Sequence, residues 1–398
     1  MSQMMQRIFL LLVLLGGPAG LPAQNSADIA KVSEAIYPRL DSPGLYERGK
    51  ALDELLSVAP GDPGTVEVLI RQFQSKDMEE ARYMDFMQRV EKALLRTAGN
   101  TTWTAANVEL LTSVLVHNDA YDARATNRTA STVAGVARHQ TFSPGAIDDL
   151  TTVLWHRVDR NPNRTRNDNT RTYVVQALVH IHQRQGLPQA VIDACVASLG
   201  NEPNASVRRG TLVLIDAHVR RQPASDALVQ ALTGVLETDG KAAVRALAAR
   251  SLRNISKQRG YPRSLLVTLQ QAAADDPDAS VQREALAGLM AAAAELPRSR
   301  EVLPPGIVTQ LLQTAGGDSD ARMRLQAWQA LGTVYATQAP DSTTLKVLLA
   351  RLGEEGDRKV RGLVAINLQQ IHARHGLDPA VMETLIPRVT DDPVAEVR

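Results

Sequence analysis

Residues 181–208 read IHQRQGLPQAVIDACVASLGNEPNASVR, and residues 371–398 read IHARHGLDPAVMETLIPRVTDDPVAEVR. The two stretches start 190 residues apart, and they share their turn, most of their apolar positions and the final Val-Arg pair. A displacement of 190 residues equals five periods of 38. We therefore interpret the chain as a repeat protein built from short units of nearly constant length.

An apolar residue followed by a polar one marks each repeat. These framing residues are Val207, Val244, Val281, Met323, Val360 and Val397, at spacings of 37, 37, 42, 37 and 37 residues. Positions 4, 5 and 8 after a framing residue are mostly apolar or small, which is the pattern of one α-helical face. Pro, Asp and Asn precede most frames, and these residues form turns and cap helices. Each repeat is therefore predicted to be two helices joined by a tight turn.

This repeat resembles the HEAT and HEAT-like family, whose unit is two antiparallel helices with an Asp-containing turn followed by Val-Arg. The resemblance is clear over residues 165–398 and weaker back to about residue 27. It implies an all-α, right-handed α-solenoid of antiparallel helix pairs, with about nine repeats plus a partial terminal unit. The chain departs from the family pattern at Lys241 and Val394, where an Asp or Asn is usual, at Gln282, and in five extra residues around 297–305.

Residues 1–23 have the pattern of a secretory signal peptide. Arg7 precedes an unbroken apolar run, residues 8–15, and a Gly/Pro/Ala stretch follows. The run is shorter than the roughly 20 residues that span a bilayer. We expect export, no membrane span in the mature chain, less regular repeats over 24–165 and regular repeats over 166–398, the last one incomplete.

The composition is that of a folded and nearly neutral chain. Apolar residues make up 44%, but there are only four Phe, seven Tyr and three Trp, so the core must consist largely of Ala, Leu and Val. Lys and Arg total 44 against 43 Asp and Glu, which argues against a nucleic-acid partner bound through bulk charge. The single cysteine, Cys195, excludes a disulfide scaffold and a thiolate zinc site. Because it lies in an apolar stretch, we expect it to be a buried small hydrophobe. An exported chain without disulfides favours the bacterial periplasm or the extracellular space.

The arginines that follow the framing residues are the most regular polar feature. They are Arg208, Arg245, Arg324 and Arg361. One hypothesis is a row of guanidinium groups awaiting an acidic partner or phosphate. The alternative, which we favour because turn acids recur in step with the arginines, is a structural ladder between neighbouring turns, as the family resemblance implies.

The second helices are predicted to line an inner, concave groove. Tyr173 opens a similar frame upstream of Val207, and positions nine and ten after the frames supply the candidate groove residues, which are His182, Asp216, Arg253, Asn254, Gln369 and Gln370. Their mixed polarity suits a protein or peptide better than a single small ligand. Residues 156–172 hold five Arg and two Asp, so Arg160, Arg164 and Arg166 form a candidate binding loop, with a solvated insertion as the alternative.

Sequence motifs of catalysis are missing: there is no GxSxG, P-loop, HExxH or dinucleotide fingerprint. His372 and His375 share a helical face, but Asp378 is the only acid nearby, so we expect no metal site. We accordingly predict no catalytic residue and no cofactor.

The leading hypothesis is an exported, non-catalytic scaffold that binds a protein or peptide along the concave face. The alternatives are a regulatory or substrate-positioning module of a larger exported enzyme and a lyase-type HEAT-like enzyme. Because the sequence stops at Val397-Arg398, where a second helix should begin, we expect either a longer parent protein or a partner over the last helix. Val381, Leu385 and Val389 would form the covered face of that helix.

Overall fold

The computed structural model describes residues 26–74, 84–121, 123–155, 167–260, 262–299, 303–318 and 320–390. Within these ranges the chain forms nineteen α-helices and one 3-10 helix, and no strand occurs in them. The predicted signal peptide and the final Val-Arg pair lie outside the described residues. None of the described helices combines the length and the apolar character that crossing a membrane requires.

The chain divides into two compact units, Met1–Val174 and Val175–Arg398. The helices of unit 1 are α2 Ser26–Leu40, α3 Leu45–Val58, α4 Pro63–Arg71 with the 3-10 helix Gln72–Gln74, α5 Met84–Asn100, α6 Ala105–Tyr121, α7 Ala123–Val136 and α8 Pro144–Trp155. They pack as the pairs α2–α3, α4–α5 and α6–α7. Helix α9, Asn167–Gln185, contains the boundary between the units, and its first turns join α8 through a 3.0 Å hydrogen bond from Arg171 Nε to the carbonyl of Leu154.

Unit 2 continues the alternation of first and second helices. Its helices are α10 Gln189–Ser198, α11 Ala205–Val219, α12 Asp226–Thr238, α13 Ala242–Arg259, α14 Arg263–Asp275, α15 Ala279–Ser299, α16 Pro305–Gly317, α17 Ala321–Tyr335, α18 Ser342–Glu354, α19 Arg358–His375 and α20 Pro379–Thr390. The even-numbered members are the first helices of their pairs and the odd-numbered members are the second helices.

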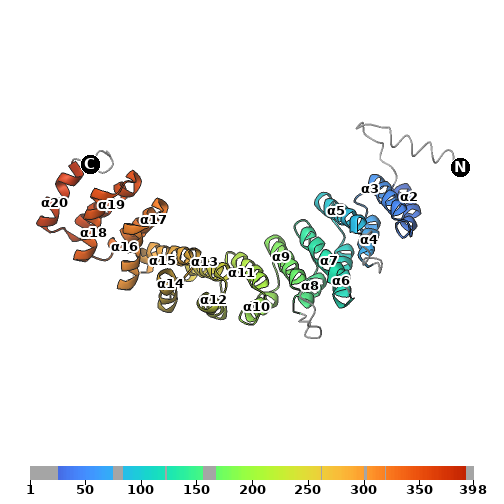
Figure 1. Ribbon diagram of the computed structural model, residues 1–398, viewed down its shortest axis with the longest axis horizontal. Helices are drawn as coiled ribbons and strands as arrows, with labels where there is room; N and C mark the ends of the chain where they lie inside the picture. The colour runs from blue at the N-terminus through green and yellow to red at the C-terminus, as the bar shows by residue number, and fades with distance from the viewer. Residues whose placement is uncertain are drawn as a thin grey trace. The chain divides into compact units, whose positions relative to one another are not determined.

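Two layers result in unit 2 (Figure 1). The second helices α11, α13, α15, α17 and α19 contact one another in order, and the first helices from α10 to α20 do the same. Each second helix also packs on the first helix before it. The described residues thus form consecutive helix pairs, stacked as an α-solenoid in unit 2, with α20 as one further helix, which confirms the predicted all-α fold of helix pairs.

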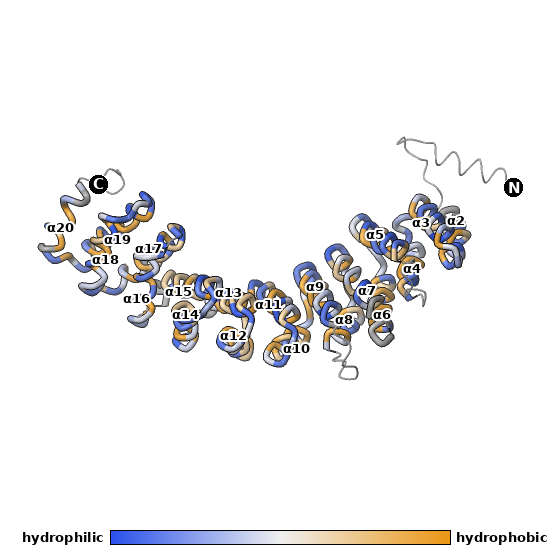
Figure 2. The backbone as a smooth tube through the Cα atoms, in the orientation of Figure 1, coloured by the Kyte–Doolittle hydropathy of each residue, from blue (hydrophilic) through white to orange (hydrophobic). Residues whose placement is uncertain are grey.

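The core follows the predicted periodicity, and apolar and polar residues alternate along each helix (Figure 2). Position 8 after the framing residue is at most 1% exposed in five repeats, at Ile215, Leu252, Leu289, Leu331 and Leu368. Full burial of such a side chain contributes about 1.5–3 kcal/mol. The stacked helix pairs bury these side chains where a single pair would expose them.

Polar residues begin the second helices and glycines end several of them. Asn204, Asp320 and Asp357 accept hydrogen bonds from the first backbone N–H groups of α11, α17 and α19, whereas Lys241 gives α13 no side-chain cap. Gly186, Gly260 and Gly376 follow α9, α13 and α19 with φ of 83°, 84° and 73°. Because residues that carry a side chain rarely adopt a positive φ, glycine suits these helix ends.

The repeated arginines bridge consecutive turns. Arg208 donates to both carboxylate oxygens of Asp239, at 2.6 and 3.0 Å, and to the carbonyl of Glu202 in its own turn, at 2.8 Å. The same geometry joins Arg245 to Asp276 and Arg324 to Glu355. We call each of these arginine–carboxylate pairs a rung of the ladder. In all three rungs the acid lies 31 residues after the arginine and two residues before the N-cap residue of the next second helix. This arrangement fixes the register of one repeat against the next.

The rungs hold their carboxyl groups in the charged form. Burial raises the pKa of Asp239, but hydrogen bonds from Arg208 and from the backbone of Lys241 outweigh it, so the net pKa lies below its usual value. The same balance lowers the pKa of Glu355, and in Asp276 the hydrogen bond from Arg245 is the largest cause. An acid with a lowered folded pKa stabilises the fold above its unfolded pKa and loses that contribution as the pH falls through the folded value. The rungs therefore lose their contribution to stability only when the pH falls below the usual pKa range of carboxyl groups.

The ladder changes at the repeat that carries the insertion. Gln282 stands at the arginine position and donates only to the carbonyl of Asp276, at 2.8 Å, which reproduces the contact within its own turn. The acid at the rung position of the following turn is Asp318, whose carboxylate accepts from the backbone N–H of Asp320. Arg361 repeats the contact within the turn by donating to the carbonyl of Glu355.

We predict that Arg245→Met lowers the free energy of unfolding by about 2–3 kcal/mol, because the mutation leaves the mostly buried carboxylate of Asp276 without its bidentate partner. Chemical denaturation followed by circular dichroism measures the change. Arg250→Met, on the exposed side of the same helix, is the matched control and should shift stability by less than about 0.5 kcal/mol. Equal effects of the two variants would contradict the structural role of the rung.

The converse change should add a rung. Gln282→Arg is expected to raise stability by up to about 1 kcal/mol, because Asp318 holds in the following turn the position that the rung acids hold in theirs. The same denaturation experiment measures it. A gain that persists when Asp318 is also changed to Asn would show that the new arginine acts in some other way.

Candidate functional site

The second helices of unit 2 present one regular row of side chains to solvent. Residues 2, 6, 9 and 13 positions after each framing residue share a helical face, because they follow the i, i+4, i+7, i+11 spacing. We call this row the solvent stripe. Most of its residues are exposed, whereas positions 4, 5 and 8 point into the core. Any partner that binds the second-helix layer must contact this stripe.

Some of the predicted groove residues are buried or engaged within the fold, and others reach the surface. His182 is only 3% exposed and lies against His218, with ring centroids 5.4 Å apart, so it is not available to a partner. Asp216 is 9% exposed, and its two oxygens accept from Asn254 at 2.7 Å and from Arg220 at 2.6 Å. Asp216 and Asn254 therefore serve to join α11 to α13.

Three predicted residues do reach the surface. Arg253 is half-buried and pairs with Glu284 of the neighbouring helix α15 at 3.1 Å. Gln369 and Gln370 are exposed on α19. Arg160, Arg164 and Arg166, the candidate binding loop, lie outside the described residues.

Sequence reasoning overlooked the cations around Arg253. Arg209, Arg250, Lys257 and Arg283 all occupy the solvent stripe and are exposed. The groove prediction covers only positions nine and ten after each framing residue, whereas the exposed face of the second helices also includes positions 2, 6 and 13. The full helical period, applied to every second helix, would have found these residues.

A shallow hollow lies on the second-helix layer over α15, and we call it the α15 trough. Its volume is about 330 Å³. The floor consists of the α15 residues Ala287, Met290, Ala291 and Ala294, and the walls include Arg253 and Lys257 of α13 and Gln326, Gln329 and Thr333 of α17. Short side chains on the central helix between longer ones on its neighbours account for the depression.

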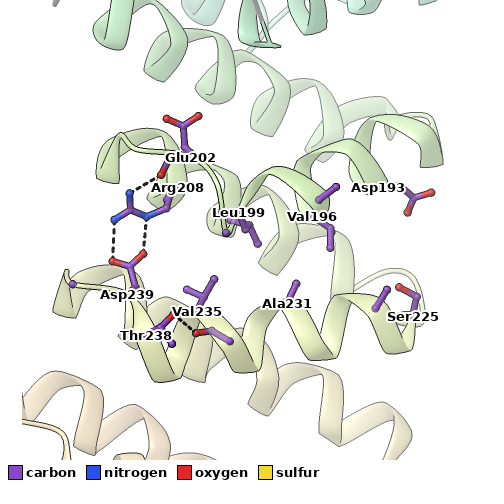
Figure 3. A pocket seen from close by; sticks show the side chains of 15 residues that line it. Asp193, Val196, Leu199, Glu202, Arg208, Ser225, Ala231, Val235, Thr238 and Asp239 are labelled. Atoms are coloured by element: carbon purple, nitrogen blue, oxygen red, sulfur yellow. Dashed lines mark hydrogen bonds and ion pairs between the residues drawn. The ribbon is translucent and has the colours of Figure 1, made fainter. Parts of the chain in front are cut away.

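A larger hollow of about 700 Å³ lies on the opposite layer, between α10 and α12 (Figure 3). Small and apolar residues such as Val196, Ala231 and Gly234 line it. Its polar groups already serve the fold: Arg208 and Asp239 form a rung at one end, and Ser225 caps α12. This groove thus offers an apolar recess more than a set of recognition groups.

The remaining predicted residues, a cysteine on α10 and two histidines on α19, lie on separate helices of the fold. Cys195 is fully buried, as predicted, and burial raises the pKa of its thiol to about 12. His372 is exposed, and the ring of His375 contacts the carbonyl of Tyr335 at 2.8 Å. No cluster of three or more possible metal ligands occurs in the described part of the chain.

Comparison with known proteins identifies the architecture. No model of a known protein family matches the chain, and no curated protein matches it. Among solved structures, the karyopherin Kap121p bound to the extreme C-terminus of the protein phosphatase Cdc14p is similar, at 13% identity over 98% of this chain and 42% of that one, with a TM-score of 0.50. Kap121p bound to Ste12p aligns at 14% identity over 95% of this chain and 40% of its own, with a TM-score of 0.53. Kap121p bound to RanGTP aligns at 15% identity over 92% and 43%, with a TM-score of 0.52.

The chain thus spans about two fifths of the length of these structures. At such low sequence identity, the similarity to these structures shows a common fold and no more. It agrees with the helix pairs and layers described above, and the fold is that of a HEAT-like α-solenoid.

The buried histidine pair makes stability depend on pH. Burial, with smaller contributions from His218 and Arg221, lowers the pKa of His182 to about 4, and burial also lowers the pKa of His218. The unfolded chain therefore binds protons that the folded chain does not, so stability falls as the pH drops from the ordinary histidine pKa near 6.5 toward 4.

We predict that wild-type protein loses about 1–2 kcal/mol between pH 7 and pH 5 through His182 and that His182→Leu removes most of this loss. Thermal unfolding across this pH range measures the slope. His372→Leu, at the equivalent but exposed position of another repeat, is the control and should leave the slope unchanged. An identical slope in wild type and His182→Leu would contradict the assignment.

Proposed function

We propose that this protein is an exported, non-catalytic scaffold that binds a protein or peptide along the second-helix layer of its solenoid, the side we predict to be concave. The observation that carries the proposal is the solvent stripe that recurs on the adjacent helices α11, α13, α15, α17 and α19. Five similar surfaces in sequence provide an extended platform, which suits a long polypeptide better than a small ligand.

Exposed apolar residues on this platform support the proposal. Val213 on α11 and Ile366 on α19 occupy the same stripe position and are 38% and 44% exposed. Apolar groups among polar ones are what a protein partner can bury. Solved structures of the same fold also include complexes with proteins, such as Kap121p with Ste12p and with Nup53p.

Export rests on the N-terminal sequence. Arg7, the apolar run of residues 8–15 and the small residues that follow form the signal-like segment. Production of the full chain with its own N-terminus in a bacterial host, followed by fractionation and intact-mass measurement, tests this part. We expect a product in the periplasm or medium that has lost about 23 residues. A full-length product in the cytoplasm would contradict export.

Site-specific photocrosslinking in the native cell tests the binding face. A photoreactive residue at position 213 or 366 should crosslink to a partner protein, because both positions lie on the second-helix layer. Position 267 is the matched control, since Val267 is an equally exposed valine, 43%, on the first helix α14. Crosslinks from position 267 alone would place the binding face on the other layer and overturn the proposal.

A further inference from the structure

Charge is divided unevenly between the two helix layers of unit 2. Within the bounds of α11, α13, α15, α17 and α19 the sequence has fifteen Lys and Arg but only three Asp and Glu. The first helices from α10 to α20 have four basic and six acidic residues. The formal charge of the whole chain is only +1, so the overall composition conceals a strongly basic layer.

Part of this positive charge is neutralised within the fold. Arg208, Arg245 and Arg324 are held by turn acids in the ladder. In the solvent stripe, Arg220 pairs with Asp216, and Arg253 pairs with Glu284. These pairs leave a set of four other cations in the solvent stripe without an acidic partner among the described residues.

We call that set the basic patch. It consists of Arg209 on α11, Arg250 and Lys257 on α13, and Arg283 on α15. All four are exposed, and no acidic side chain of the described residues pairs with them. Four exposed cations on three adjacent helices create a field that attracts an acidic partner.

The stripe changes character immediately beyond α15. It consists of Leu325, Gln329 and Gly332 on α17, with Ala336 directly after that helix, and of Gly362, Ile366, Gln369 and Ala373 on α19. None of these residues carries a charge. The α15 trough lies at this boundary, with Arg253 and Lys257 on one wall and Gln326 and Gln329 on the other.

We infer that the α15 trough and the basic patch bind an acidic polypeptide segment in which an apolar side chain adjoins glutamates or aspartates. The apolar side chain occupies the trough over Ala287, Ala291 and Ala294, and the carboxylates face the basic patch. The amides of Gln326 and Gln329 can both donate to and accept from a peptide backbone lying along the wall. This inference rests on the proposed function and specifies the chemistry of its partner.

A polypeptide fits the surface better than a nucleic acid, the other polyanion. Proteins that bind single strands stack bases on aromatic side chains. The solvent stripe of the five second helices, all of it within the described residues, contains no aromatic residue. A floor of alanines offers apolar contact to a side chain and no stacking platform to a base.

Binding of synthetic peptides to the full chain tests the inference, with fluorescence anisotropy as the readout. The probe is a short labelled peptide in which glutamates flank central leucines. One control peptide replaces glutamate by lysine, another replaces leucine by serine, and a labelled single-stranded DNA serves as the nucleic-acid control. We expect the glutamate–leucine peptide to bind at least about tenfold more tightly than each of the three controls. Its affinity should fall with added salt, as exposed charges are screened.

Variants then locate the site. Arg250→Glu combined with Lys257→Glu should weaken the glutamate–leucine peptide by about tenfold or more. Ala294→Trp, which fills the exposed end of the trough, should weaken it by about fivefold through loss of the apolar contact. Lys346→Glu, a charge reversal of an exposed lysine on the first helix α18, is the matched control and should leave affinity within about twofold. Circular dichroism of every variant confirms that its helices are intact.

Three outcomes would overturn the inference. They are equal binding of the glutamate and lysine peptides, binding that survives both the charge reversal and Ala294→Trp, and tighter binding of DNA than of peptide. Crosslinking from positions 213 and 366 without peptide binding would remove only this inference and leave the proposed function intact. Crosslinking from position 267 alone would remove both.

Discussion

Each described helix pair leaves apolar flanks that only neighbouring helices cover, and the rest of the structure depends on that constraint. The framing residues and the residues eight positions later face neighbouring helices on either side, so each repeat is completed by the repeats next to it. Apolar burial supplies the attraction but is non-directional. The rungs from Arg208 to Asp239, Arg245 to Asp276 and Arg324 to Glu355 add direction, because a bidentate pair tolerates little displacement between successive turns.

The ladder also determines what the surface offers. The turn acids Asp239, Asp276 and Glu355 are paired with arginines at the start of the second helices, so they do not neutralise the cations further along those helices. Arg250 and Lys257 therefore stay exposed on α13, although the chain as a whole is nearly neutral. On α15, where Ala287, Ala291 and Ala294 replace longer side chains, the same layer becomes hollow. Charge and shape thus combine in one place because of how the repeats use their acids and their small residues.

The sequence predicted the fold well because stacking of repeats is a periodic constraint. The spacing of the framing residues was enough to place first and second helices and the turns between them. The partner of each ladder arginine was less accessible: Lys241 looked like a break in the pattern, whereas the acid that accepts from Arg208 is Asp239, two residues earlier. Only the three-dimensional path of the turn distinguishes the capping position from the rung position.

The site was predicted less well, for a similar reason. Asp216 shares a register position with Arg253, yet its carboxylate is occupied by Asn254 and Arg220, and the predicted groove residue His182 is buried against His218. Register alone cannot show which side chains a neighbouring repeat covers or engages. The basic patch, in contrast, could have been found from the sequence, since the excess of arginine on second helices requires only that charges be counted helix by helix.

Hydrogen–deuterium exchange of the full chain, with and without a saturating glutamate–leucine peptide, tests the central claim most directly. We expect slower exchange on peptide addition in α13, α15 and α17, with α10 and α12 unchanged. Protection of α10 and α12, or no protection anywhere in the second-helix layer, would contradict it.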